Sequence, residues 1–266
     1  MAKGRQAVCL GAGLLAAICP FALPAALADE HHSPEMRYLA CVALAESAPE
    51  AALERAREWS GRGGGTAARH CLALALVSLG RSEEAGRELE NVAEAMRREA
   101  GPQPDQNETM ALANVLAQAG NAWLLAGQAK RARRALNQAL ALAPEDPDML
   151  VDRAVVSAAL GDFGTALADL DLALANESDH VDAHAYRASA LRRLERPEDA
   201  LAAAQRALDI LPGHPGARLE RGVLRHQAGD AAGALEDWRF LVDQAAGTKE
   251  AEAAAKYLKA MPSGKN

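Results

Sequence analysis

Hydrophobic positions in this chain recur at helical spacing, in pairs of short segments separated by tight turns. In the stretch 147–180, one segment runs from about 148 to 160, a Gly-Asp pair interrupts it, and a second runs from about 165 to 174. The apolar positions of the second segment, such as Ala166 and Leu170, lie on one face of a helix. The pattern predicts two short helices joined by a turn.

The two-helix pattern repeats every 34 residues. The positions in phase are Gly127, Gly161 and Gly229, with Glu195 in the fourth place; Ala132, Ala166, Ala200 and Ala234; Ala139, Ala173 and Ala207; and Leu140, Leu174, Leu208 and Val242. Self-similarity at a fixed period is typical of a repeat array, in which each unit buries its apolar face against its neighbours.

These positions resemble the tetratricopeptide repeat, which has a small residue at position 8, Gly at 15, Ala at 20 and 27, and often Pro at 32. Four regular units follow without a gap, at 113–146, 147–180, 181–214 and 215–248. A weaker unit fits 66–99 and a degenerate one about 33–65. The resemblance implies an all-α fold, a right-handed α-solenoid of helix-turn-helix repeats.

The same pattern divides the chain into segments. We expect a signal peptide at 1–28, degenerate helical hairpins at 29–99, a loop with two prolines at 100–107, the regular units within 108–248, and a capping helix at 249–261. A cap is needed because a stack must end on something that covers its last apolar face.

The first 28 residues are typical of an export signal. Lys3 and Arg5 precede an apolar stretch, and Ala26-Leu27-Ala28 offers a small-x-small cleavage site. An uncleaved membrane anchor is the alternative, but Pro20 and Pro24 interrupt the apolar run, which is short for a membrane span. We therefore predict cleavage after Ala28, no membrane span in the mature chain, and a periplasmic or secreted location.

Export changes the interpretation of the cysteines. Cys41 and Cys71 would remain after cleavage as a pair in an oxidising compartment, where a disulfide could staple the least regular end of the array. Two buried free thiols are the alternative. Cleavage would also place His31 third in the chain, where a free amine and imidazole can bind Cu(II) or Ni(II). A polar tail without metal is the favoured reading there.

Composition and charge exclude several functions. Aromatic residues make up only 3% of the chain, which does not suit a stacking platform for single-stranded nucleic acid. The formal net charge is −7, and an acidic chain binds a phosphate backbone poorly. The sequence has no phosphate loop, nucleophile elbow or His-Glu-x-x-His motif. We expect no catalytic residues, no cofactor, no metal site and no nucleic-acid partner.

Recurring charged residues have structural explanations. His180 and His214 share the last position of a unit, so we expect solvated surface histidines rather than metal ligands. Arg153, Arg187 and Arg221 recur at position 7, and Asp169 and Asp237 recur at position 23. Bacterial members of the resembled family often pair these two positions. Arg187 lacks such an acid, because Ala203 stands there, and is expected either to bind Asp199 or to be free for a ligand.

The resemblance also implies that first helices line a concave groove, mainly through positions 2, 5, 9, 12 and 13. Carried onto this sequence, the groove residues are Asn114, Ala117, Asn121 and Leu124; Asp148, Val151 and Val155; Asp182, Ala185, Ser189, Arg192 and Arg193; and Leu219, Val223 and His226. Chaperone-binding members grip a C-terminal carboxylate with Lys at position 5, which is absent here. An extended or helical peptide on a mainly apolar groove is expected instead. An envelope scaffold that also uses the convex face is the alternative.

Overall fold

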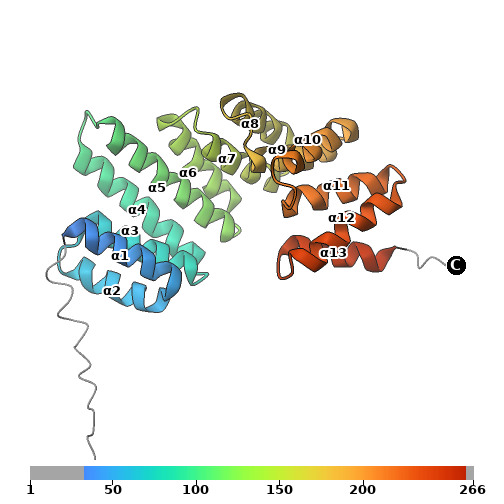
Figure 1. Ribbon diagram of the computed structural model, residues 1–266. Helices are drawn as coiled ribbons and strands as arrows, with labels where there is room; N and C mark the ends of the chain where they lie inside the picture. The colour runs from blue at the N-terminus through green and yellow to red at the C-terminus, as the bar shows by residue number, and fades with distance from the viewer. Residues whose placement is uncertain (1–32, 262–266) are drawn as a thin grey trace, which may run out of the picture.

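The computed structural model describes residues 33–261, and within this range it contains helices and no strands (Figure 1). The helices are α1 (Pro34–Ser47), α2 (Pro49–Gly61), α3 (Gly65–Ser78), α4 (Ser82–Ala100), α5 (Gln106–Leu125), α6 (Ala129–Leu142), α7 (Pro147–Ala159), α8 (Phe163–Asn176), α9 (Val181–Arg193), α10 (Pro197–Ile210), α11 (Pro215–Gln227), α12 (Ala231–Gln244) and α13 (Lys249–Ala260).

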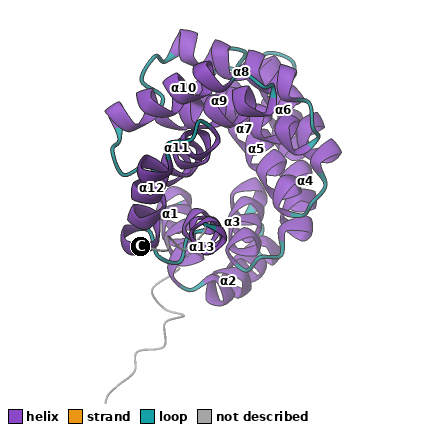
Figure 2. Ribbon diagram, turned by 90° about the vertical axis from the view of Figure 1, so that its right-hand side faces the viewer, coloured by secondary structure: helices purple, strands orange, loops and turns teal. Residues whose placement is uncertain are grey.

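Successive helices pack as antiparallel pairs, and the pairs stack into a solenoid. Odd-numbered helices line the inside and even-numbered helices lie outside, as the view along the solenoid axis shows (Figure 2). The all-α solenoid expected from the repeat pattern is confirmed. The last helix, α13, packs against α11 and α12. Its Tyr257 stacks on Trp238, with ring centroids 4.8 Å apart, and Ala254 is fully buried. In this way α13 covers the end of the stack.

The turn at position 15 requires a left-handed backbone. Gly127, Gly161 and Gly229 have φ angles of 72°, 80° and 86°, a region that glycine enters without steric cost. Glu195 occupies the equivalent place with φ 58°, the one non-glycine residue of the described range with positive φ. The third regular unit thus keeps the turn at a cost that glycine would avoid.

Small residues at position 8 let the two helices of a unit approach each other closely. A Cβ added to Gly120 would lie 2.6 Å from a side-chain carbon of Leu136. One added to Gly222 would lie 2.5 Å from the indole nitrogen of Trp238. Alanines at position 20 are likewise buried, with 0% exposure for Ala132 and Ala200 among them. The helices are therefore held by packing that larger side chains would disrupt.

Ion pairs join the two helices within units at positions 7 and 23. Arg153 donates two hydrogen bonds to Asp169, at 2.9 and 2.7 Å. Arg221 likewise donates to Asp237, at 2.9 and 2.6 Å. This pairing is the one expected from the sequence.

The prediction for Arg187 was wrong in both of its forms. Its Nε donates to Asp171, 2.6 Å away on the second helix of the preceding unit, so the arginine is not free. Asp199 accepts instead from Arg196 in the first turn of α10. Asp171 is within reach because stacking sets α8 beside α9, a relation between units that the pattern within one unit does not contain.

The prediction of solvated histidines at the ends of units was also wrong, because both side chains are engaged within the chain. His180 Nδ1 accepts from the backbone N–H of Ala183 and caps α9, and its Nε2 lies 3.0 Å from Asp148. His214 repeats the arrangement at α11, with Nε2 2.9 Å from Asp182. Because Nδ1 accepts, Nε2 carries the hydrogen and donates to the carboxylate. Each histidine thus links one unit to the next.

At the N-terminal end, a disulfide joins Cys41 of α1 to Cys71 of α3, with Cα atoms 6.1 Å apart. Both residues are buried and pack with Ala56. The predicted signal peptide at 1–28 and His31, for which a polar tail without metal is expected, lie outside the described residues. Within 33–261, no helix is both long enough and apolar enough to cross a membrane.

Candidate functional site

The inner face of the solenoid carries a series of cavities between successive odd-numbered helices. Two lie near the N-terminal end, lined mainly by α3, α4 and α5, and two lie towards the C-terminal end, along α7, α9, α11 and α13. We refer to these as the N-terminal hollow and the C-terminal hollow. Together they form the candidate functional site.

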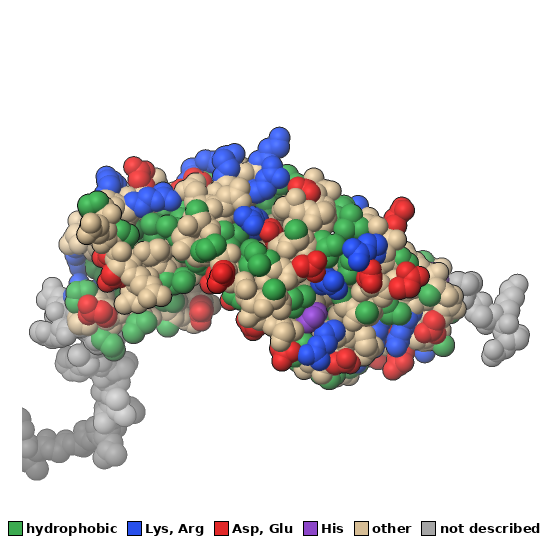
Figure 3. Space-filling view, turned by 90° about the horizontal axis from the view of Figure 1, so that it is seen from above, with side chains coloured by type: hydrophobic (Ala, Val, Ile, Leu, Met, Phe, Trp, Pro, Cys, Tyr) green, Lys and Arg blue, Asp and Glu red, His purple; other side chains and the backbone are tan. Residues whose placement is uncertain are grey.

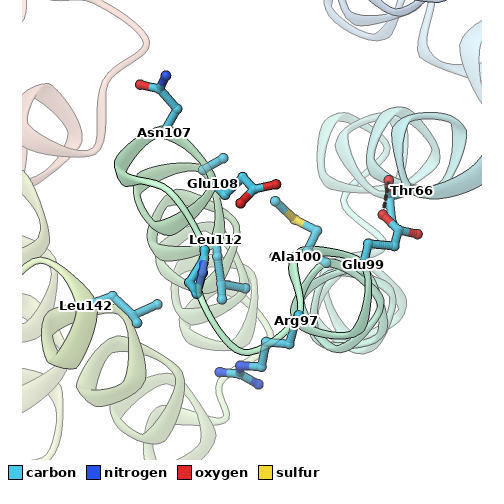
Figure 4. Close-up of a pocket in the computed structure, with 12 residues that line it drawn as sticks. Thr66, Arg97, Glu99, Ala100, Asn107, Glu108, Leu112 and Leu142 are labelled. Carbon is cyan, nitrogen blue, oxygen red and sulfur yellow. Dashed lines mark hydrogen bonds between the residues drawn. The ribbon is translucent and has the colours of Figure 1, made fainter.

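The N-terminal hollow consists of two cavities, of about 560 and 360 Å³, that share Thr66, Met96 and Ala111. The larger one lies beside the turn between α4 and α5, where Leu112 and Leu142 form an apolar wall (Figure 4). At its rim Thr66 donates a hydrogen bond to Glu99, 3.2 Å away (Figure 4). The helices α4 and α5, which contribute most of the lining of the larger cavity, have 19 and 20 residues and are longer than the other helices of the described range.

The smaller N-terminal cavity contains a polar network centred on His70. Its Nδ1 lies 2.7 Å from the hydroxyl of Tyr38, and its Nε2 lies 2.6 Å from Oε1 of Gln118. Since an amide oxygen only accepts, Nε2 carries the hydrogen and Nδ1 accepts from Tyr38. Burial lowers the pKa of His70, and the hydrogen bond to Gln118 opposes this effect. A neutral imidazole therefore sits between α1 and α5.

The C-terminal hollow consists of two further cavities that share Tyr186 and Ser189. One, of about 220 Å³ between α7 and α9, is lined by Val155 and Phe163 among other apolar residues. The other, of about 300 Å³, lies between α9, α11 and the start of α13. It combines an apolar floor that includes Leu219 with carboxylates at its rim.

The predicted groove residues divide into three groups in the structure. Five line the hollows: Asn114, Val155, Asp182, Ser189 and Leu219, with the nearly buried Ala185 at the floor. Ala117, Val151 and Val223 are buried in the core and offer little surface.

The remaining groove residues are engaged within the chain or lie beside the cavities. Asn121 donates to Asp152, Asp148 accepts from His180, Arg192 pairs with Glu220, Arg193 lies over the ring of Phe163, His226 lies against Trp238, and Leu124 packs against the core. The Arg192–Glu220 hydrogen bonds are 2.6 and 3.2 Å long. Arg192 is therefore neutralised within the chain, whereas Arg193 is exposed and contacts the ring of Phe163.

Sequence reasoning missed position 6 of the units. Its residues in the four regular units are Gln118, Asp152, Tyr186 and Glu220. Gln118, Tyr186 and Glu220 line cavities of the inner face. Position 6 follows position 2 by one helical turn, so the exposed stripe runs through 2, 6 and 9. Position 5 is buried in the first two regular units and lines a cavity in the last two. The available signal was the polar or aromatic character of position 6 in every regular unit.

Asp152 is the strongly perturbed carboxyl group of the inner face. Burial raises its pKa to about 6, and the nearby Asp148 and Asp146 add to this effect. The amide of Asn121 donates to it over 2.7 Å, which works in the opposite direction. In the described part of the chain no group of three or more His, Cys, Asp or Glu side chains is placed to hold a metal ion.

Family comparisons agree with this architecture. Residues 124–192 match a family model described as tetratricopeptide repeat, and residues 187–239 match a second model with the same description. Residues 124–239 are tetratricopeptide repeats. The matches cover α6 to α11 completely and most of α12, so they include the C-terminal hollow except for Glu250 on α13. No curated protein matches the chain.

Solved structures show the same fold at low sequence identity. The YrrB structure is described as a TPR protein with an unusual peptide-binding site; it is 19% identical, with a TM-score of 0.51, covering 77% of this chain and 97% of that one. MamA from Desulfovibrio magneticus RS-1 (residues 41 to the end) is also 19% identical, with a TM-score of 0.55, covering 69% and 97%. Another MamA structure is 16% identical, with a TM-score of 0.53, covering 76% and 100%.

Proposed function

We propose that this TPR protein is an exported interaction adaptor that holds a peptide or protein segment against its inner face and performs no chemistry. The observation that supports it most is the row of open, mainly apolar cavities along α7, α9, α11 and α13, where a rigid scaffold offers surface without a catalytic group. YrrB, which has the same fold, is described as having a peptide-binding site.

Export is supported by two independent features. The N-terminal segment has the charge, apolar stretch and cleavage pattern of a signal peptide. The Cys41–Cys71 disulfide is the kind of bond that persists in an oxidising compartment. Export with cleavage predicts a mature chain that begins at Asp29, and N-terminal sequencing of the protein from the envelope fraction tests it. A chain that retains Met1 would refute cleavage.

Site-specific photocrosslinking tests groove binding. A photoreactive residue at Ser189, which lines both C-terminal cavities, is expected to capture a partner. The same residue at Leu201, exposed on the outer helix α10, is the matched control. Val155→Arg would fill the cavity between α7 and α9 and should abolish capture at Ser189, while Leu201→Arg should not. Capture that survives Val155→Arg would contradict groove binding.

A scaffold that uses the convex face is the second candidate. Viewed from above, the molecule shows apolar side chains mixed with both charges, and basic side chains gather along one edge (Figure 3). Such a surface could hold further subunits. Capture of several envelope proteins at Leu201, with none at Ser189, would favour the scaffold over the groove adaptor.

A further inference from the structure

The two cavities of the C-terminal hollow adjoin each other along three helices. Its two cavities share Tyr186 and Ser189, so a single extended segment can cross from Val155 on α7 to Leu219 on α11 without leaving the inner face. The cavity floors are apolar, whereas polar groups stand at the rim. This arrangement suits a segment that alternates between apolar anchors and charged side chains.

The rim of this hollow is acidic. Asp182, Glu220 and Glu250 contribute carboxylates from α9, α11 and α13. Glu220 is already neutralised by Arg192, which leaves Asp182 and Glu250 as the carboxylates available at the rim without an arginine partner there. Asp182 has a side chain that is 58% exposed and receives one hydrogen bond from His214. Two further acids, Asp148 and Asp152, lie on α7 next along the inner face.

The aromatic ring of Tyr186 lies in the same cavity as these rim acids. Tyr186 is 44% exposed and lines both cavities. Burial raises its pKa most, and the charges of Asp182, Glu250 and Asp152 raise it further. Asp182 and Glu250, from α9 and α13, line one cavity together with this ring. An aromatic face in a negative field is a favourable place for a Lys or Arg side chain.

We propose that the C-terminal hollow binds a basic segment of a partner protein. A Lys or Arg stem lies along Leu219 and the ring of Tyr186, and its charged end lies between Asp182 and Glu250. A neighbouring apolar side chain enters the cavity beside Val155. This inference rests on the proposed groove function and adds the chemistry of the occupant.

A random dodecapeptide library selected on the folded protein tests the proposal. Peptides from the wild type are expected to be enriched in Lys and Arg near one apolar residue. The groove variant Asp182→Asn/Glu250→Gln should bind the selected peptides about threefold to tenfold more weakly, because exposed charge pairs each contribute modestly. The control variant Glu198→Gln/Glu236→Gln also removes two negative charges, but from exposed positions on outer helices. It should bind like the wild type.

Affinity of a selected peptide should also fall as the salt concentration rises, in the wild type and the control alike. If the selected peptides are acidic or uncharged and do not bind the Val155→Arg variant, the basic-partner inference is overturned and groove binding stands. Equal loss of affinity in both charge variants would also overturn it, since net charge alone would then explain binding. If every selected peptide still binds the Val155→Arg variant, or none is selected, the groove function itself is refuted.

Discussion

Asp237 is the most heavily partnered acid of the structure, and its replacement by Asn tests how the solenoid is held together. Its side chain is 0% exposed, and it accepts two hydrogen bonds from Arg221. Arg218 and Arg225 also donate to it, over 3.1 and 3.0 Å. Asn keeps the shape but removes the charge, so three arginine side chains would lose their shared counter-ion. Breaking such a buried group costs about 3–5 kcal/mol.

Two other acids provide a graded comparison for Asp237. Asp169 accepts from Arg153, whose side chain is 25% exposed, so Asp169→Asn should cost about 1–3 kcal/mol. Asp199 pairs with Arg196, and both side chains are about half exposed, so Asp199→Asn should cost less than about 1 kcal/mol. The order of the three losses follows the burial of each pair.

Urea unfolding followed by circular dichroism at 222 nm measures these losses. With a slope of about 2–3 kcal/mol per molar urea, Asp237→Asn should lower the midpoint by about 1–2 M. Because each unit depends mainly on its neighbours, hydrogen exchange should show the loss concentrated in α11 to α13. An Asp237→Asn midpoint that matches that of Asp199→Asn would show that the buried cluster does not stabilise the fold, and would refute the reasoning.

Four further predictions follow from local features. Asp152→Asn should stabilise the protein relative to wild type increasingly as the pH rises from about 4 to 6, by about 1–3 kcal/mol at the plateau, because the raised pKa makes ionised Asp152 costly in the folded state. Glu195→Gly should stabilise by about 0.5–1 kcal/mol, since it removes a positive φ from a side-chain-bearing residue. Gly222→Ala should destabilise by about 1–3 kcal/mol through contact with the buried indole of α12. Reduction of Cys41–Cys71 should cost about 2–4 kcal/mol, seen as faster hydrogen exchange in α1 to α3.

Thermal or urea unfolding measures the effects of the three substitutions, and hydrogen exchange measures that of the disulfide. A stability difference for Asp152→Asn that is flat between pH 4 and 6 would contradict the pKa argument. Glu195→Ala keeps the positive φ and should not stabilise; if it matches glycine, charge rather than backbone is responsible. Gly164→Ala meets no atom within 4 Å and should not destabilise. A reductant should leave the double variant Cys41→Ala/Cys71→Ala unchanged.

The repeat architecture could be read from the sequence because its signals are local. Glycine at the turn allows the positive φ angle, and small residues at positions 8 and 20 allow two adjacent helices to approach closely. The Arg153–Asp169 pair likewise joins residues 16 apart within one unit. Each of these relations recurs every 34 residues, so the period alone reveals them.

What lies between units could not be read in this way. Arg187 binds Asp171, a residue of the preceding unit, and Arg192 binds Glu220 of the following unit. Only the rotation and offset of one unit on the next bring such groups together. The same offset decides that position 6 also faces the groove, and that Asp182 and Glu250 line one cavity with Tyr186.

The sequence by itself therefore determined the helical pairs, their turns and the fold class, because these depend on contacts over short chain distances. Only the tertiary structure decided where the inner face opens into cavities and which charges meet there. The lining of the N-terminal hollow comes mainly from α3, α4 and α5, and that of the C-terminal hollow includes α9, α11 and the start of α13. Such packing is set by the superhelix as a whole, which no single repeat encodes.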